Sequence, residues 1–321
     1  MLVEYMMSWM TPFWIGVYLF VSVTPFILLW KQKAKFAGTK ELNEKYWSFA
    51  RNDIHLWSLP RFVVSFALLG GPIRFLIAWG CVMLLFVISW VVMIGHTPGK
   101  KVGKMRTLIL TWSIRILVRI IMLCAGIVYI STSHDETKID FKKYLGPDWK
   151  IDPKQTAGIQ VANHTCFLDV CTMGYLQFPI SMVSGEAVRG LPGIYGIGEA
   201  AQNIWMERGG SSEARAKTLR EITERQALIE KGVCPTLNIF PEGATTNAKS
   251  IIKFKKGAFV GLNAVRPVVY RYSPLTGLEV EQAIVGIPFA TFISVCTVMT
   301  TLQVDYLPIF KPNEYFWKNH W

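Results

Sequence analysis

The residue pair in this sequence most suited to catalysis is a histidine followed five positions later by an aspartate, in the run NHTCFLD at residues 163–169. We predict that this run joins a strand over 158–163 to a helix over 165–177. Side chains at the carboxyl ends of strands in an α/β sheet face the ligand crevice. His164 is therefore a candidate general base, and Asp169 would fix its tautomer and stabilise the imidazolium. Since about one sequence in ten has this spacing by chance, the pair needs support from other residues.

Two other runs end predicted strands with polar residues. The run FPEGATTN at 240–247 contains Glu242, which can accept a hydrogen bond from a substrate hydroxyl or hold an arginine, and Gly243, which permits close approach of a bulky headgroup. The run NIWMER at 203–208 ends in Arg208, whose guanidinium is suited to a phosphate. Each run taken alone is more commonly a plain turn or an exposed, ion-paired arginine.

The second half of the chain alternates short apolar strands with helices, which indicates an α/β domain with a mixed sheet flanked by helices. We assign residues 131–157 to a linker and residues 158–321 to this domain. The run VRPVVYRY at 265–272 is predicted to be an apolar strand with a structural role only. The predicted strands cover residues 158–163, 180–184, 203–207, 235–240, 267–272 and 302–307, and the predicted helices cover residues 165–177, 187–199, 212–230, 255–264 and 281–299.

The first part of the chain, residues 1–104, has the composition of a membrane region. Residues 12–30 give 19 positions without a charge and are predicted to span a bilayer, and residues 75–95 give another 21. If the second stretch also crosses completely, the basic loops before and after it fall on opposite faces, against the positive-inside tendency. A re-entrant hairpin within residues 61–95, bent at residues 70–72, keeps both loops on one side, and we favour it over a full span.

A third apolar stretch, at residues 105–130, carries Arg115 and Arg119 four positions apart, hence on one face of a helix. Charges are costly at the bilayer centre, so this helix is predicted to lie at the membrane interface, with its arginine side chains reaching the headgroups. A helix buried beneath the α/β domain is the equal alternative.

Charge and cysteine content exclude two classes of protein. The formal net charge is +12, and residues 1–130, with 14 basic and 4 acidic side chains, carry +10 of it. The basic excess accompanies the apolar segments, as expected of contact with anionic lipid headgroups and not of nucleic-acid binding. The six cysteines show neither the spacing of a zinc site nor that of a disulfide framework, so no metal is predicted.

Taken together and in this order, the four runs resemble the glycerolipid acyltransferase family, which includes 1-acylglycerol-3-phosphate and lysophospholipid acyltransferases. That family is marked by Asn-His-x-x-x-x-Asp, an aromatic-containing strand ending in Arg, then Phe-Pro-Glu-Gly-Thr and a Pro-Val strand. The resemblance covers about residues 105–315, and FPEGATTN, RPVVYRY and LQVDYLPIFKPNE are most similar to the lysophosphatidylcholine and lysophosphatidylethanolamine branch. Two positions depart from the pattern, because Ala244 stands at the usual first Thr and Gln202 at the usual Gly.

The resemblance implies a glycerolipid acyltransferase-like fold and a membrane-bound enzyme that moves an acyl chain from acyl-CoA to the free hydroxyl of a lysophospholipid. It implies that His164 and Asp169 are catalytic. The substrate-binding residues expected from it are Asn163, Arg208, Glu242, Gly243, Ala244 and Thr245. The run Lys253, Lys255 and Lys256 is a candidate for the CoA phosphates, with a solvated face as the alternative. No cofactor is expected beyond acyl-CoA as co-substrate.

The expected partners are membrane lipids, a lysophospholipid and acyl-CoA. The competing interpretation is a protein that keeps the acyltransferase fold as a structural or lipid-binding subunit of a larger membrane complex. The endoplasmic reticulum is the membrane in which the family is usually found, and the mitochondrial inner membrane is the alternative.

Overall fold

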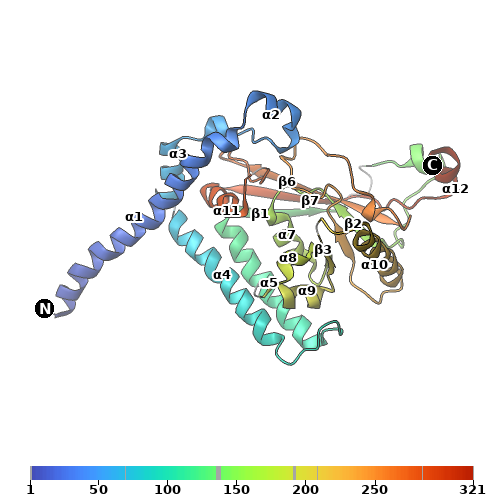
Figure 1. Ribbon diagram of the computed structural model, residues 1–321, viewed down its shortest axis with the longest axis horizontal. Helices are drawn as coiled ribbons and strands as arrows, with labels where there is room; N and C mark the ends of the chain where they lie inside the picture. Colours follow the sequence, from blue (N-terminus) through green and yellow to red (C-terminus); the bar gives the residue numbers. More distant parts are fainter. Residues whose placement is uncertain are drawn as a thin grey trace.

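The computed structural model describes residues 2–68, 70–134, 139–190, 193–207, 209–283 and 285–320. Within these residues seven strands form one sheet in the order β1-β7-β6-β2-β5-β3-β4 (Figure 1). Strands β6 and β7 pair antiparallel and the other neighbours pair parallel, so the sheet is mixed, as predicted. The strands are β1 (Ile127–Ser133), β2 (Ile159–Ala162), β3 (Ser181–Gly185), β4 (Ile204–Met206), β5 (Leu237–Ile239), β6 (Val265–Pro274) and β7 (Thr300–Tyr306).

Helices cover both faces of this sheet. One apolar core joins β2, β6 and β7 to α4, α5, α7 and α9, and a second joins β2, β4 and β5 to α10 on the other face. A third core packs α11 against Phe36 of α1, Phe62 of α3 and Trp57, which follows a 3-10 turn at Ile54–Leu56. The α-helices are α1 (Leu2–Ala37), α2 (Lys40–Lys45), α3 (Leu59–Val63), α4 (Gly71–Val92), α5 (Lys104–Cys124), α6 (Lys142–Leu145), α7 (Phe167–Gln177), α8 (Glu186–Arg189), α9 (Ile194–Ala201), α10 (Ser212–Glu230), α11 (Ile287–Cys296) and α12 (Glu314–His320).

The six predicted strands all form, and the structure adds a seventh strand, β1. The predicted helix over 187–199 corresponds to two helices, α8 and α9, and the short helices α6 and α12 form where none was predicted. Strand β1, at the edge of the sheet, crosses the boundary between the predicted interfacial helix and the predicted linker. The predicted helix over 255–264 is wrong, because only a single 3-10 turn forms, at Lys256–Ala258. That stretch contains Gly257 and Gly261, and glycine disfavours a helix interior by about 1 kcal/mol.

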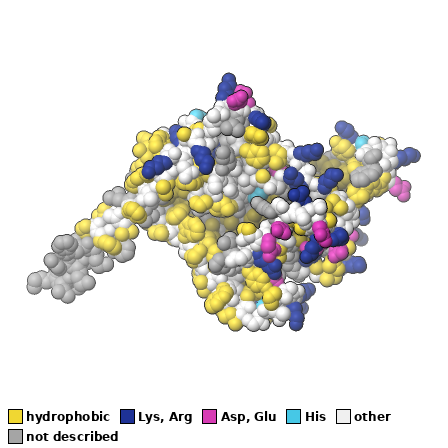
Figure 2. Space-filling view, in the orientation of Figure 1, with side chains coloured by type: hydrophobic (Ala, Val, Ile, Leu, Met, Phe, Trp, Pro, Cys, Tyr) yellow, Lys and Arg dark blue, Asp and Glu magenta, His cyan; other side chains and the backbone are white. Residues whose placement is uncertain are grey.

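Two helices among the described residues, α4 and α5, are long and apolar enough to cross a membrane by length and composition. They lie side by side, and each buries one stripe and exposes apolar side chains on the rest of its surface (Figures 1 and 2). On α4 the buried stripe consists of Ala78, Cys81, Leu85 and Ser89, spaced three or four positions apart. Both ends of α4 touch the α/β part: its first turns contact α11, and near its end the Ser89 hydroxyl donates to Gly193 O, 2.7 Å away, before α9.

The membrane predictions can be placed on these elements. The predicted span at residues 12–30 lies inside α1, which is one continuous helix. Residues 61–95 are interrupted at Gly70, whose φ of +70° is a left-handed conformation that glycine adopts readily, so the chain breaks at the predicted bend. A hairpin or a full span across the bilayer stays a prediction. Helix α5 combines features of both alternatives, because one face packs on α7 and the sheet while Met105 and Trp112 are exposed.

Candidate active site

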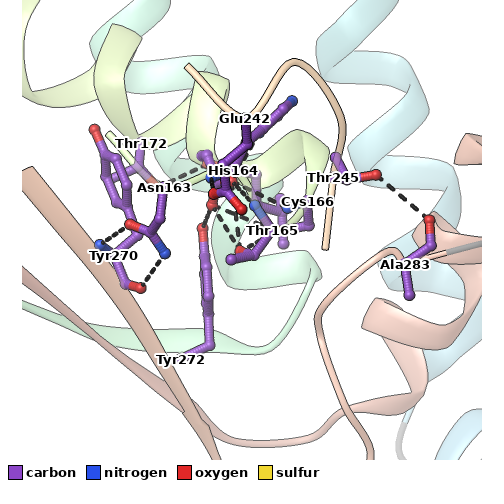
Figure 3. Close-up of polar contacts among 12 residues, drawn as sticks. Asn163, His164, Thr165, Cys166, Thr172, Glu242, Thr245, Tyr270, Tyr272 and Ala283 are labelled. Carbon is purple, nitrogen blue, oxygen red and sulfur yellow. Dashed lines mark hydrogen bonds and ion pairs between the residues drawn. The ribbon is translucent and has the colours of Figure 1, made fainter. Parts of the chain in front are cut away.

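The predicted pair comes together at the carboxyl end of β2. His164 follows the strand (Figure 3), Asp169 lies in the first turn of α7, and the imidazole Nδ1 is 3.0 Å from the carboxylate Oδ2. A carboxylate only accepts hydrogen bonds, so Nδ1–H donates and the lone pair of Nε2 is left to take a proton. The Asp169 side chain is fully buried, whereas the His164 side chain is 20% exposed. The arrangement is that of a general base with an orienting carboxylate.

The spacing between the two residues has a local structural cause. Cys166 is the N-cap of helix α7, and Asp169 is the third residue of the helix, where a side-chain oxygen can bond the free N–H groups of the helix start. Its Oδ2 accepts from the backbone N–H of Thr165 at 2.6 Å and of Cys166 at 3.0 Å. The hydroxyl of Tyr272, from β6, donates to the other oxygen, Oδ1, at 2.7 Å. The carboxylate is therefore fixed before it meets the histidine.

The imidazole ring is also held from the side. Phe240 stacks on the ring of His164, with the ring centroids 4.1 Å apart and the planes 18° from parallel. Phe240 follows β5, so the stacking joins the His164 loop to the run that contains Glu242. Stacking leaves the ring edge, and with it Nε2, as the reactive side.

Glu242 faces backbone groups. Its side chain is almost fully buried, with Oε1 accepting from the N–H of His164 at 3.0 Å and Oε2 accepting from the N–H of Ile252 at 3.4 Å. Burial raises the pKa of this carboxyl, and the two N–H groups oppose the rise. Glu242 thus ties the His164 loop to the segment after the turn, which differs from the expected contact with a substrate hydroxyl or an arginine.

The rest of the predicted turn is partly open. Gly243 has a φ of +72°, and both Gly243 and Ala244 are exposed, whereas the hydroxyl of Thr245 donates to Ala283 O at 3.4 Å (Figure 3). Gly243 and Ala244 are therefore the positions where a substrate can approach the backbone closely. Asn163 does not face this opening, because its side chain donates to Tyr270 O at 3.0 Å and accepts from Tyr270 N at 2.8 Å between β2 and β6.

The turn is anchored by a segment that precedes the α/β domain, residues 46–53. The side-chain amide of Asn247 donates to Trp47 O at 2.6 Å and to Ala50 O at 2.9 Å, and its backbone N–H donates to Ser48 O at 2.8 Å. Asn247 is fully buried. The end of the FPEGATTN run is therefore docked on a chain segment about 200 positions away.

A buried ion pair extends this docking to a second loop. Arg51 and Asp53 form two short hydrogen bonds, of 2.8 and 2.7 Å, and the same guanidinium donates to the carbonyls of Glu279 and Glu281. The next residue of that loop, Gln282, donates its N–H to Thr165 O at 2.7 Å. Segment 46–53 thus contacts both loops that flank the His164 loop.

The remaining predicted residues fall into two groups. Arg208 lies outside the described residues. Lys253, Lys255 and Lys256 are exposed, and the stem of Lys255 lies beside Gly243. Among the described residues, no group of three or more His, Cys, Asp or Glu side chains is placed to hold a metal ion.

Sequence reasoning missed Tyr272, Arg51, Asp53 and Asn247. Tyr272 is in a run predicted to be only structural, and its contact joins residues 103 positions apart. Arg51 and Asp53 lie in the membrane half, where charged residues indicate loops.

The departure at Gln202 is explained, because this residue ends α9 with a φ of +58°, the left-handed conformation that the more usual glycine adopts without strain.

The sequence of this chain is similar to those of known acyltransferases. A sequence model of the acyltransferase family matches residues 149–270. The lysophospholipid acyltransferase LPEAT1 of Arabidopsis thaliana is 26% identical over 87% of this chain and 78% of its own length. LPEAT2 of the same plant is 31% identical, and human lysophosphatidylcholine acyltransferase 1 is 28% identical, each over 50% of this chain. This chain spans only 29% and 30% of those two proteins.

Among solved structures, the 1-acyl-sn-glycerophosphate acyltransferase PlsC of Thermotoga maritima is similar over 75% of this chain and 85% of its own, with a TM-score of 0.46 and 13% identity. The family-model match identifies an acyltransferase domain by sequence. The chain therefore carries an acyltransferase domain at residues 149–270, and it is similar to lysophospholipid and lysophosphatidylcholine acyltransferases, as its sequence motifs predicted.

Proposed function

We propose that this protein is a membrane-bound acyl-CoA:lysophospholipid O-acyltransferase with His164 as its general base. The observation that carries the proposal is the 3.0 Å contact between His164 Nδ1 and the buried Asp169, which leaves Nε2 able to accept a proton at a partly exposed position. The relatives named as lysophospholipid and lysophosphatidylcholine acyltransferases support the substrate class.

The reaction needs one proton carrier and no covalent intermediate. Nε2 of His164 takes the proton of the lysophospholipid hydroxyl as the oxygen attacks the thioester carbonyl of acyl-CoA. The C–S bond of the tetrahedral intermediate then breaks, and the imidazolium returns the proton to the leaving thiolate. Asp169 stabilises the imidazolium between the two steps. Most of the rate enhancement then comes from holding two bound substrates in line.

The substrate positions follow from the exposed parts of the site. We assign the glycerol phosphate to the Gly243–Ala244 backbone and to Arg208, with Glu242, Thr245 and Asn163 supporting the loops from behind. Lys253, Lys255 and Lys256 are assigned to the CoA phosphates, because they are exposed cations that directly follow the turn. Acyl-CoA is the only co-substrate in this proposal, and no cofactor takes part.

The membrane half gives the substrates a route. Lysophospholipids and acyl chains partition into bilayers, and the exposed apolar surfaces of α4 and α5 suit a protein that lies against the acyl region. The proposed partners are therefore the lipids themselves. We place the protein in the endoplasmic reticulum membrane, with the mitochondrial inner membrane as the alternative compartment.

The test is acyl transfer by the purified full chain in mixed micelles. Radiolabelled palmitoyl-CoA is supplied with lysophosphatidylcholine, lysophosphatidylethanolamine or lysophosphatidate. The substitution His164→Ala should lower turnover by about 10²-fold or more. The control His320→Ala removes an exposed imidazole from α12 and should leave turnover unchanged. Equal turnover by wild type and H164A would refute the proposal, and a folded wild type that transfers no acyl chain would favour a structural subunit.

A further inference from the structure

Tyr272 is the one hydroxyl that reaches the catalytic carboxylate from the centre of the sheet, among the residues the structure describes. It lies on β6, where Val268, Tyr270 and Tyr272 alternate into the core that contains α7. Its hydroxyl donates to Asp169 Oδ1 at 2.7 Å, and both side chains are buried (Figure 3). A charged acceptor makes this kind of hydrogen bond about twice as strong as a neutral one.

The two oxygens of Asp169 have different partners. Oδ2 accepts from His164 Nδ1 and from the backbone N–H groups of Thr165 and Cys166, at 2.6 to 3.0 Å. Oδ1 accepts from Tyr272 at 2.7 Å, and its other contacts, the Thr165 hydroxyl and the Cys166 thiol, are longer at 3.2 and 3.7 Å. Tyr272 is thus the main donor on the side of the carboxylate that faces away from the histidine.

We infer that Tyr272 is a positioning residue of the catalytic pair, holding the Asp169 carboxylate in line with His164 and drawing part of its negative charge away from the imidazole. The inference rests on the proposed function. Without the hydroxyl, Oδ1 would lose its shortest bond while buried, and the carboxylate could rotate about its side-chain torsion. More of its charge would then act on His164 and favour the imidazolium.

Several other titratable groups lie near the carboxylate. Those that interact with Asp169 are Cys166 and Cys171 of the α7 region, Tyr270 and Tyr272 of β6, and Glu242 after β5; Glu281 lies near Cys166. Burial raises the pKa of Tyr272 well above its usual value, so the hydroxyl remains a donor at neutral pH. Burial also raises the pKa of Glu281 to about 7, but Glu281 is present in every variant compared below and cancels in the difference.

The test compares Tyr272→Phe with the wild type in two assays. In acyl transfer from palmitoyl-CoA, Y272F should lower kcat by about tenfold and leave both KM values within about twofold, because the residue touches no substrate. The acid limb of the pH profile of kcat/KM should move up by about half a pH unit. In ¹⁵N-histidine NMR, with the His164 signal assigned by its absence in H164A, the midpoint of the His164 titration should move up by the same amount.

Two matched variants separate positioning from general packing. Tyr306→Phe removes a similarly buried hydroxyl on β7, whose partner is Gln177, and should move neither the pH profile nor the titration midpoint. In an Asp169→Ala background there is no carboxylate to hold, so adding Y272F should change kcat by less than about twofold.

Each outcome decides between defined alternatives. An unmoved His164 midpoint in Y272F, or a loss of kcat in the Asp169→Ala background as large as in the wild type, would overturn the role of Tyr272. If the wild type transfers no acyl chain but the His164 midpoint still moves in Y272F, the proposed reaction is wrong and the hold of Tyr272 on the pair stands.

Discussion

The two sides of the candidate site are built over different distances along the chain. On the His164 side, the imidazole, the Asp169 carboxylate and the helix start that orders them all lie within residues 163–169. On the opposite side, the turn at residues 242–247 is held by segment 46–53 and by the loop at residues 279–283. The first side therefore depends on a helix start, whereas the second depends on distant segments docking correctly.

This difference bears on what an acyltransferase domain needs in order to work. The part of the chain that the family model matches, residues 149–270, contains His164 and Asp169 but not Tyr272, Arg51 or the 279–283 loop. The buried Arg51–Asp53 pair holds the 279–283 loop, and Trp47 and Ala50 of the same segment accept hydrogen bonds from Asn247 of the turn. The segment before α3 therefore belongs structurally to the site. We call residues 163–169 the local side of the site, and the turn at residues 242–247 with segment 46–53 and the 279–283 loop the remote side. Substitutions on the local side should lower turnover, whereas substitutions on the remote side should lower stability and weaken substrate binding.

The largest effect is expected on the local side, from changes at Asp169. Asp169→Ala should lower kcat by about 10³-fold, since it removes both the orientation and the charge that His164 needs. Asp169→Asn should lose less, about 10²-fold, because the backbone N–H groups of Thr165 and Cys166 would select the amide oxygen at the Oδ2 position, where His164 Nδ1 can still donate. Steady-state kinetics of both variants test the difference, and equal losses would mean that the N–H groups do not select the oxygen.

A comparable loss, but of stability, is expected on the remote side from Arg51→Met. The substitution leaves Asp53 buried without its cation, which costs about 3 kcal/mol and frees the 279–283 loop. Thermal unfolding of the purified protein should show a lower Tm, and the KM for lysophospholipid should rise more than kcat falls.

The control for this change is Lys217→Met, which breaks an exposed ion pair with Glu221 on α10 and should alter stability by less than about 0.5 kcal/mol. Combining Arg51→Met with Asp53→Leu should recover part of the lost stability, because the unpaired charge is removed as well. A Tm of the single Arg51 variant equal to that of wild type would show that the pair does not hold the site together.

The same contrast explains which parts of the site the sequence could predict. The His164–Asp169 pair was predictable because its spacing follows from one strand end and one helix start, and the six predicted strands follow from short apolar runs. Tyr272, Arg51 and Asn247 were not, since their partners lie 100 to 230 positions away and nothing in the local pattern marks a polar residue that will meet a distant one. Glu242 was found by its motif, but the direction of its side chain required the fold.

The smallest effect is expected at Glu281 on the remote side, where the stability of the protein should depend on pH. Burial raises the pKa of its carboxyl to about 7, with Glu279 adding to the rise and Arg51 and Lys249 opposing it. In the unfolded chain a glutamate ionises at a pH of about 4.3, so unfolding releases a proton between these two values, and wild-type stability should fall as the pH rises through that window.

Glu281→Gln keeps the neutral form at every pH, so the loss of stability with rising pH should shrink. At pH 8 the variant should be more stable than wild type by about 2 kcal/mol, whereas at pH 4 the two should be nearly equal. Tm measured across this range, together with the KM for lysophospholipid, is the test. Gln282, the residue after Glu281, donates its N–H to Thr165 O of the His164 loop. A change in kcat that follows the same pH dependence as Tm would therefore show that the remote side affects the local side. An identical pH dependence of Tm in wild type and variant would show that Glu281 is not the group that ionises.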